Sequence, residues 1–299
     1  MPVDLQHCGQ ATTPACIRAL YDVPSPAMVA RDFSGNSSTT LGVFEALNYY
    51  NQSDLDQYFA TFAQHVPAGT HPSLQSVEEA QVNESAPAQL RIESNADLDI
   101  LYALTCPKNI TLYQVDAEAG YQQATADDSL FIGISNLLAA LDGSFCSEAD
   151  TAHGIDCGTS SLSTVTSISY DTGELYYPEK HQHRLCNEFM KLALQGHTFV
   201  VASGDWGVAS DWNDDTLTNG CAVSGNYTAS LSNTENGTIF HPQFPANCPY
   251  VLSVGGTMLN ENSTVRDAES PMHQPLAEAE LYAEEGLAQL YPTTTSSSG

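Results

Sequence analysis

Predicted strands and helices alternate along most of this chain of 299 residues. Short β-branched and apolar runs are separated by longer segments in which apolar residues recur at helical spacing. This alternation is typical of α/β proteins, because parallel strands need crossover connections that pack on the sheet. We therefore expect a doubly wound, mostly parallel sheet flanked by helices. The strands are expected at 40–45, 110–115, 165–170, 198–202 and 250–254, and the helices at 53–63, 92–104, 129–141 and 181–195.

Local signals refine this assignment. Ser53 is expected to be the N-cap of helix 53–63. Strand 40–45 is expected to be buried on both faces except at Glu45. The last forty residues differ in composition: they are rich in Ala and Glu, with a possible helix from Pro275 to Leu290 before a Thr/Ser tail.

The charge of the chain is strongly negative. There are 36 Asp and Glu against 8 Lys and Arg, a formal net charge of −28, although charged residues make up only 15% of the chain. Such a surface repels phosphate backbones and anionic lipids, which argues against nucleic-acid and membrane partners. A shortage of bases suits a protein that works in acid, where protonation of carboxylates relieves self-repulsion.

Cysteines and glycosylation sequons indicate passage through a secretory pathway. The eight cysteines form no CxxC pair, which argues against a zinc or thioredoxin-like site. The first expected disulfides are Cys8–Cys16 and Cys146–Cys157, and the other pairings stay open. No signal peptide is recognisable at the start, so we expect a mature or an incomplete form of a secreted, extracellular protein. Seven Asn-x-Ser/Thr sequons begin at Asn36, Asn51, Asn83, Asn109, Asn226, Asn236 and Asn262.

The first candidate site follows the predicted strand 198–202. The sequence continues as Ser-Gly-Asp205-x-Gly207, a sharp turn that displays one carboxylate. Gly204 and Gly207 permit positive φ or close approach of a substrate. In open α/β sheets, catalytic groups gather at the carboxyl ends of strands. The alternative is a purely structural turn.

The second candidate site is Glu93-Ser-Asn-Ala-Asp97, at the head of helix 92–104. Spacing of four residues places both carboxylates on one helix face. If that face is buried, the two acids share a proton and can transfer protons at acid pH. Alternatively, Ser94 and Asp97 form a capping-box variant, with Glu93 favoured by the helix dipole. Asp99 adds a third acid and leaves the assignment open.

Three other patterns are less informative. Gly158-Thr-Ser160-Ser161 resembles a nucleophile motif, but it lies in a predicted loop with no base nearby. His181 and His183 begin a helix at a spacing that cannot place both on one face, which argues against a metal site there. The two tryptophans, Trp206 and Trp212, are more typical of packing or pocket-wall residues than of a binding cage.

Six motifs occur in a fixed order along the chain. They are Thr13–Tyr21, Glu93-x-x-x-Asp97 before the strand at Thr111, Ser167–Tyr170, Gln182–Phe189, Ser203–Gly207 and Phe244–Thr257. Together, over residues 8 to 258, they resemble the sedolisins, or serine-carboxyl peptidases, and within them the fungal tripeptidyl-peptidase branch.

This resemblance implies a subtilisin-like fold and the hydrolysis of peptides or proteins at acid pH by a monomer, either as a tripeptidyl-peptidase or as an endopeptidase. By position, Glu93 is the general base and Asp97 orients it and shares its proton. Asp205 is the protonated donor in the oxyanion hole, where a buried carboxyl stays neutral. Glu45 resembles an accessory acid of the proton network in some members.

The sequence departs from the family beyond Thr257. The family's nucleophilic serine lies in a Ser-Gly-Thr-Ser stretch, which is not found after Thr257, and the family's Ca²⁺ site has no counterpart. We therefore expect an incomplete peptidase domain at 1–258 and a divergent or truncated segment at 259–299. A truncated peptidase should fold poorly and not cut peptides by itself, with apolar sheet edges exposed. The alternative is an inactive pseudo-peptidase that binds peptides.

Overall fold

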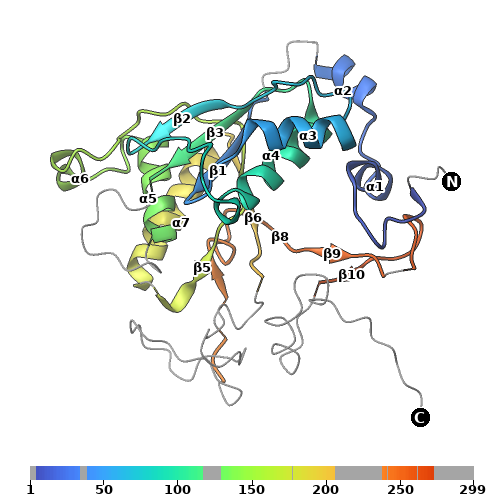
Figure 1. Cartoon of the computed structure of the whole chain (residues 1–299). Helices are drawn as coiled ribbons and strands as arrows, with labels where there is room; N and C mark the ends of the chain where they lie inside the picture. The colour runs from blue at the N-terminus through green and yellow to red at the C-terminus, as the bar shows by residue number, and fades with distance from the viewer. Residues whose placement is uncertain are drawn as a thin grey trace.

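Six parallel strands form the central sheet of the computed structural model, in the order β2-β3-β1-β4-β6-β8 (Figure 1). The structure describes residues 5–33, 39–116, 129–176, 178–205, 238–240, 242–260 and 262–272. The parallel pairing confirms the expected α/β fold class. The strands are β1 (Leu41–Ala46), β2 (Ser73–Val77), β3 (Ile110–Val115), β4 (Val165–Ile168), β6 (Thr198–Ala202) and β8 (Leu252–Val254).

The strand order reverses direction between β1 and β4. From β1 the chain adds β2 and β3 on one side, and then β4, β6 and β8 on the other. Ligands of open α/β sheets bind outside the carboxyl ends of the strands at such a switch point. Residues that follow β1 and β4 are therefore the first place to look for a site.

Helices cover both faces of the sheet (Figure 1). Adjacent residues of β1 point to opposite faces: Val43 packs in one apolar cluster and Phe44 in the other. The strand is therefore buried on both sides, which explains its almost uninterrupted apolar sequence. The cluster around Val43 includes residues of α3 (Gln52–Phe62) and α4 (Ile92–Thr105), and that around Phe44 includes residues of α5 (Ser129–Leu141) and α7 (Glu179–Leu194).

The N-terminal helices pack beside α4. The Arg18 guanidinium donates hydrogen bonds of 2.7 and 3.0 Å to the carbonyl oxygens of Ala103 and Leu104, so a cation satisfies the C-terminal end of α4. The smaller elements are α1 (Pro14–Leu20), α2 (Pro26–Phe33), α6 (Glu148–Ala152), the 3₁₀ turns η2 (Ala88–Leu90) and η4 (Glu174–Tyr176), and the antiparallel pairs β5 (Thr172–Gly173) with β7 (Gln243–Phe244) and β9 (Thr257–Met258) with β10 (Ser270–Pro271).

Three disulfides link the described residues. Cys8–Cys16 and Cys146–Cys157 are the two pairs expected from the sequence. The third, Cys186–Cys248, joins α7 to the segment that follows β7, across 62 residues of sequence. It connects two of the motifs that carry the family resemblance. Cys106 is buried as a free thiol, and Cys221 lies outside the described residues.

Several predicted boundaries need correction. Asn51, not Ser53, is the N-cap of α3, because its side-chain oxygen accepts from the Asp54 backbone N–H. Strand β4 ends at Ile168, α7 starts two residues earlier than predicted, and β8 starts only at Leu252. The possible helix from Pro275 to Leu290 lies outside the described residues.

Strand β8 is the last strand of the sheet in the described part of the chain, and it carries exposed apolar side chains. Leu252 is 57% exposed and Val254 is 49% exposed. An edge strand of this kind is an aggregation liability unless another segment covers it. None of the described helices is both long and apolar enough to cross a membrane.

Candidate active site

The first two turns of α4 project Glu93, Ser94 and Asp97 toward the ends of β1 and β4. The helix starts at Ile92, and its N-cap Arg91 makes no side-chain cap hydrogen bond. Ser94 is buried, and its hydroxyl donates a 2.6 Å hydrogen bond to Oε2 of Glu45. The interpretation of Ser94 and Asp97 as a capping box is therefore wrong: Ser94 binds a tertiary partner instead of a backbone N–H.

Glu45 lies at the end of β1 and is 0% exposed, so it is not the exception to burial that the sequence suggested. The Tyr170 hydroxyl donates a 2.7 Å hydrogen bond to the same Oε2 that Ser94 contacts. Among the residues that the structure describes, no side chain or backbone N–H donates a hydrogen bond to the buried Oε1 of Glu45. Burial, followed by the charges of Asp97 and Glu93, raises the pKa of Glu45 well above its ordinary value, against the opposing hydrogen bonds from Ser94 and Tyr170.

Asp97 is held from β4. The Ser169 hydroxyl lies 3.0 Å from Oδ1 and 2.8 Å from Oδ2 of Asp97 and donates to this carboxylate. Burial raises the pKa of Asp97, while hydrogen bonding to Ser169 and to Glu45 lowers it. Two carboxyl groups can share a hydrogen bond only when one is protonated. The raised pKa values of Asp97 and Glu45 favour a neutral member in this pair, which avoids two adjacent charges.

Glu93 is half-buried beside Asp97. Burial first, and then the charge of Asp97, raise the pKa of Glu93 to about 7; a hydrogen bond with Ser169 opposes this rise and Asp205 adds to it. Glu93, Asp97 and Glu45 thus form a line of acids that retain protons where ordinary carboxyls are ionised. Ser169 contacts both Glu93 and Asp97.

Asp205 follows β6 in a turn that only glycine permits. Gly204 has φ +85°, and a Cβ at this position would lie 1.0 Å from Oε1 of Gln243. This turn brings Asp205 close enough to Glu93 for the charge of Asp205 to raise the pKa of Glu93. Asp205 itself is exposed, so the described residues do not supply the burial expected of a neutral oxyanion donor. Trp206 and Gly207 lie outside the described residues.

Asp99 belongs to a different environment from Glu93 and Asp97. Burial, and then the charge of Asp54, raise the pKa of Asp99 to about 7. Its charge also raises the pKa of Tyr58 on α3, after the larger effect of burial. Asp99 therefore faces the contact between α3 and α4.

The less informative patterns have structural roles. The carbonyl of Ser161 accepts a 2.6 Å hydrogen bond from the Tyr113 hydroxyl, and the Ser160 N–H donates to the carbonyl of Ala140. His183 lies 3.3 Å from Glu179 on the same helix. Within the described ranges, no group of three or more His, Cys, Asp or Glu side chains is placed to hold a metal ion. Trp212, like Trp206, is outside them.

A recess of about 460 Å³ includes none of the three candidate catalytic acids. Its lining comes from η4, the start of α7 and the segment after β7, and includes Glu174, Gln182, Phe244 and Asn247. The recess begins four residues after Tyr170, so it lies on chain segments that continue from the acid cluster.

Sequence reasoning missed the roles of Ser94, Ser169 and Tyr170. All three lie within or beside motifs that were recognised, but neither motif indicates which residue each side chain contacts. The available signal was the position of Ser169 and Tyr170 just after a strand at the switch point, where polar residues commonly serve a site.

Comparison with known proteins gives consistent matches. Aorsin from Aspergillus oryzae is 34% identical over 312 residues, covering 97% of this chain and 44% of that protein. Tripeptidyl-peptidase sed1 from Aspergillus fumigatus is 39% identical over 266 residues, which cover 84% of this chain and 38% of that protein. Tripeptidyl-peptidase SED1 from Arthroderma otae is 35% identical over 286 residues, which cover 88% of this chain and 39% of that protein. The chain spans less than half the length of each of these relatives.

Among solved structures, a Pseudomonas sedolisin, a serine-carboxyl proteinase complexed with two molecules of pseudo-iodotyrostatin, aligns with a TM-score of 0.49 and 19% identity, covering 83% of this chain and 54% of that one. No family model matches the sequence.

Proposed function

Because the chain belongs to the sedolisin family, in its fungal tripeptidyl-peptidase branch, we propose that it carries the acid half of a serine-carboxyl peptidase site that hydrolyses peptides at acid pH. The observation that carries this proposal is the convergence of Glu93, Asp97 and Asp205 at the carboxyl ends of neighbouring parallel strands. Glu93 and Asp97 lie beside one another partly buried, which is unusual for ordinary surface acids.

In this proposal, Glu93 removes the proton of the serine nucleophile. Asp97, fixed by Ser169, orients Glu93 and shares its proton, and Glu45 stores a further proton behind Asp97. A pair of interacting acids titrates in two steps that belong to the pair. The working form of the pair is singly protonated, with the proton on Asp97 so that the Glu93 carboxylate can accept the proton of the serine. This form is lost as pH rises through the upper apparent pKa of the pair, to which the raised pKa of Glu93, about 7, belongs. Activity is therefore confined to acid pH.

Asp205 would donate a hydrogen bond to the oxyanion of the tetrahedral intermediate. Asp205 is exposed among the described residues, so bound substrate or residues outside the described ranges would have to enclose the oxyanion hole. The substrate would be a peptide, and the relatives named tripeptidyl-peptidases favour removal of tripeptides over internal cleavage.

We further propose that the protein is secreted and works as a monomer without nucleic-acid or membrane partners. Three disulfides in the described chain and the strongly acidic composition support an extracellular setting. The division into a peptidase domain at 1–258 and a distinct segment at 259–299 belongs to the same proposal.

The nucleophile decides between two forms of this proposal. These 299 residues contain no Ser-Gly-Thr-Ser stretch beyond Thr257, so the acids described here have no serine of the family pattern to activate. A serine encoded further along the same reading frame would complete a peptidase. The alternative is a pseudo-peptidase that binds peptides, which is less favoured because Glu93, Asp97 and Asp205 are all retained.

Sequencing the native transcript past codon 299 tests this choice. A frame that continues into a Gly-Thr-Ser stretch supports the peptidase, and its product should cut tripeptide reporter substrates at acid pH. In that product, Glu93→Gln should lower kcat/KM by about 10³-fold, the usual contribution of a general base. A stop at codon 299, or a Glu93→Gln variant with unchanged kcat/KM, contradicts the proposed mechanism.

A further inference from the structure

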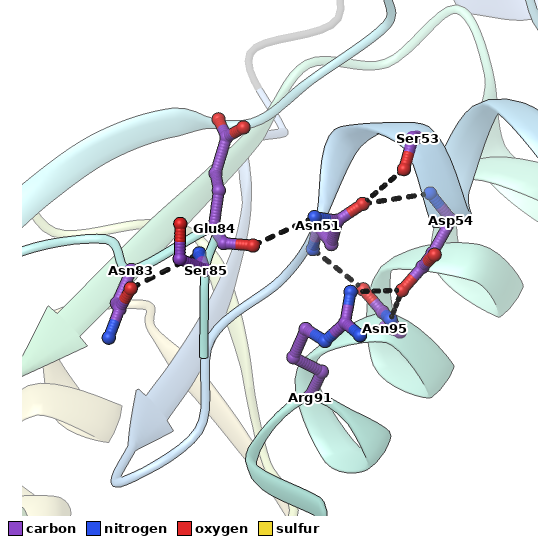
Figure 2. Close-up of polar contacts among 8 residues, drawn as sticks. All are labelled: Asn51, Ser53, Asp54, Asn83, Glu84, Ser85, Arg91 and Asn95. Atoms are coloured by element: carbon purple, nitrogen blue, oxygen red, sulfur yellow. Dashed lines mark hydrogen bonds and ion pairs between the residues drawn. The ribbon is translucent and has the colours of Figure 1, made fainter. Parts of the chain in front are cut away.

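Two of the glycosylation sequons lie against each other in the fold. Figure 2 shows Asn51-Gln-Ser53 at the start of α3 beside Asn83-Glu-Ser85. The Asn51 side-chain amide donates a 2.9 Å hydrogen bond to the carbonyl oxygen of Glu84, the middle residue of the other sequon. The two asparagines share a region of the surface, but their side chains are engaged very differently.

The Asn51 side chain is part of the structure. Its Oδ1 accepts hydrogen bonds from the Asp54 N–H at 3.1 Å and from the Ser53 hydroxyl at 2.6 Å, and so caps α3. The backbone N–H of Asn51 donates a 2.9 Å hydrogen bond to Oδ1 of Asn95 on α4. Asn51 thereby ties together α3, α4 and the 83–85 loop. A sugar on its half-buried amide would sit in this junction, beside the carbonyl of Glu84.

The Asn83 side chain makes far fewer contacts. Asn83 is exposed, and its Oδ1 accepts from the Ser85 N–H at 3.1 Å. In the described part of the chain no residue accepts a hydrogen bond from its Nδ2, and in Figure 2 this nitrogen points away from the other residues drawn. Ser85 is also exposed, and only its backbone N–H takes part in the contact with Asn83.

We propose that Asn83 is an N-glycan acceptor and that Asn51 stays unmodified because its amide is used to hold the fold. The donor is a lipid-linked diphosphate oligosaccharide, transferred by the host oligosaccharyltransferase. A bond forms between Nδ2 of Asn83 and the anomeric carbon of the first sugar, while the bond from that carbon to the lipid diphosphate breaks. Nδ2 loses one proton, and the diphosphate leaves with the bonding electron pair. This inference rests on the proposed secretory route.

The test uses the whole chain, directed into the secretory pathway of a yeast by a cleavable leader. Ser85→Ala removes the Asn83 sequon and keeps the backbone N–H that contacts Asn83. Its matched control, Ser53→Ala, removes the Asn51 sequon and keeps the Asp54 N–H on the Asn51 cap. Gel mobility of the protein in whole-cell extract, before and after endoglycosidase treatment, and mass spectrometry of the released peptides report which asparagine carries sugar.

We expect Ser85→Ala to lose one glycan and Ser53→Ala to lose none. A glycan at another sequon such as Asn109 or Asn262, with none at Asn83, overturns the inference but leaves the secretory route intact. A chain without glycan at any sequon overturns both, and sugar on Asn51 overturns the second half of the proposal. As an independent check, Asn51→Gln should lower the denaturant midpoint of unfolding, whereas Asn83→Gln should leave it unchanged; equal midpoints would contradict the structural role of Asn51.

Discussion

The Ser169 hydroxyl lies 2.8 Å and 3.0 Å from the two carboxylate oxygens of Asp97, and it also contacts Glu93. Ser169 comes from the residue after β4, and the two acids come from the first turns of α4. One hydroxyl therefore links the end of a central strand to both members of the proposed dyad. The Ser169 hydroxyl has one hydrogen to donate, and its hydrogen bond stabilises the ionised form of the carboxylate that accepts it.

Replacing Ser169 should raise the pKa values of the acid pair. In Ser169→Ala the carboxylates lose a donor to their charged form, and the apparent pKa of Glu93 should rise by about one unit, because a hydrogen bond to a charged group contributes about 1.5 kcal/mol or more. Carbon-13 NMR of the side-chain carboxyls measures the shift. Ser169→Thr keeps a hydroxyl and should restore the original titration. Equal titration curves for the Ala variant and the wild type would show that Ser169 does not tune the pair.

Glu45 should make the stability of the fold depend on pH. Its pKa is raised in the folded state, so the folded chain binds more protons than the unfolded chain between the ordinary carboxyl range and the raised value. Stability should therefore fall as pH rises from about 4 toward neutrality. Glu45→Gln keeps an acceptor for Ser94 and Tyr170 but cannot ionise. Its free energy of unfolding at pH 7.5 should exceed that of the wild type by about 1–3 kcal/mol, because the wild-type carboxyl must there be buried as a charge or kept protonated.

At pH 4 the same Glu45→Gln change should have little effect or be mildly destabilising, because the wild-type carboxyl is neutral there. Urea unfolding followed by circular dichroism at both pH values measures the difference. A Glu45→Gln variant with the same pH dependence as the wild type would contradict the burial of an ionisable acid at this position.

Gly204 should tolerate no side chain. Gly204→Ala combines positive φ with a clash against Gln243, whereas Gly196→Ala places a Cβ at φ +96° with no atom within 4 Å. The control should cost about 1 kcal/mol from the left-handed backbone alone. The Gly204 variant should cost clearly more, and the Glu93 titration should also change because the Asp205 turn is displaced. Similar unfolding free energies for the two variants would mean that the contact with Gln243 is not tight.

The third disulfide should contribute more stability than the second. Cys186–Cys248 closes a separation of 62 residues and Cys146–Cys157 one of 11. The chain-entropy model then gives the longer loop about 1.5 kcal/mol more stabilisation. Paired Cys→Ala variants at each bridge, compared by urea unfolding, provide the measurement. A larger loss from the 146–157 pair would show that native packing, not loop closure, dominates.

Much of the fold could be predicted from the sequence because its signals are local. Strand 110–115, helix 129–141 and strand 198–202 appear where their periodicity and turn residues place them. The cap of α3 was missed because Asn51 and Ser53 are both good cap residues, and only the structure shows which oxygen reaches the Asp54 N–H.

The contacts within the acid cluster could not be predicted from local sequence patterns. Glu93 and Asp97 were identified by their spacing on a helix, yet the only role that the sequence offered for Ser94 was the alternative of a helix cap, because its partner Glu45 lies 49 residues away. The contact of Tyr170 with Glu45 spans 125 residues, and the Cys186–Cys248 bridge spans 62. Contacts of this range depend on how the strands are ordered in the sheet, which no local pattern encodes.

The most direct test of the proton-holding cluster is a site-resolved titration of Glu93 by carbon-13 NMR, in the wild type and in Asp97→Asn. The account predicts an apparent pKa of about 7 for Glu93, lowered in the variant because the neighbouring charge is removed. A Glu93 pKa near the ordinary 4.3 or so, unaffected by Asp97→Asn, would contradict the account.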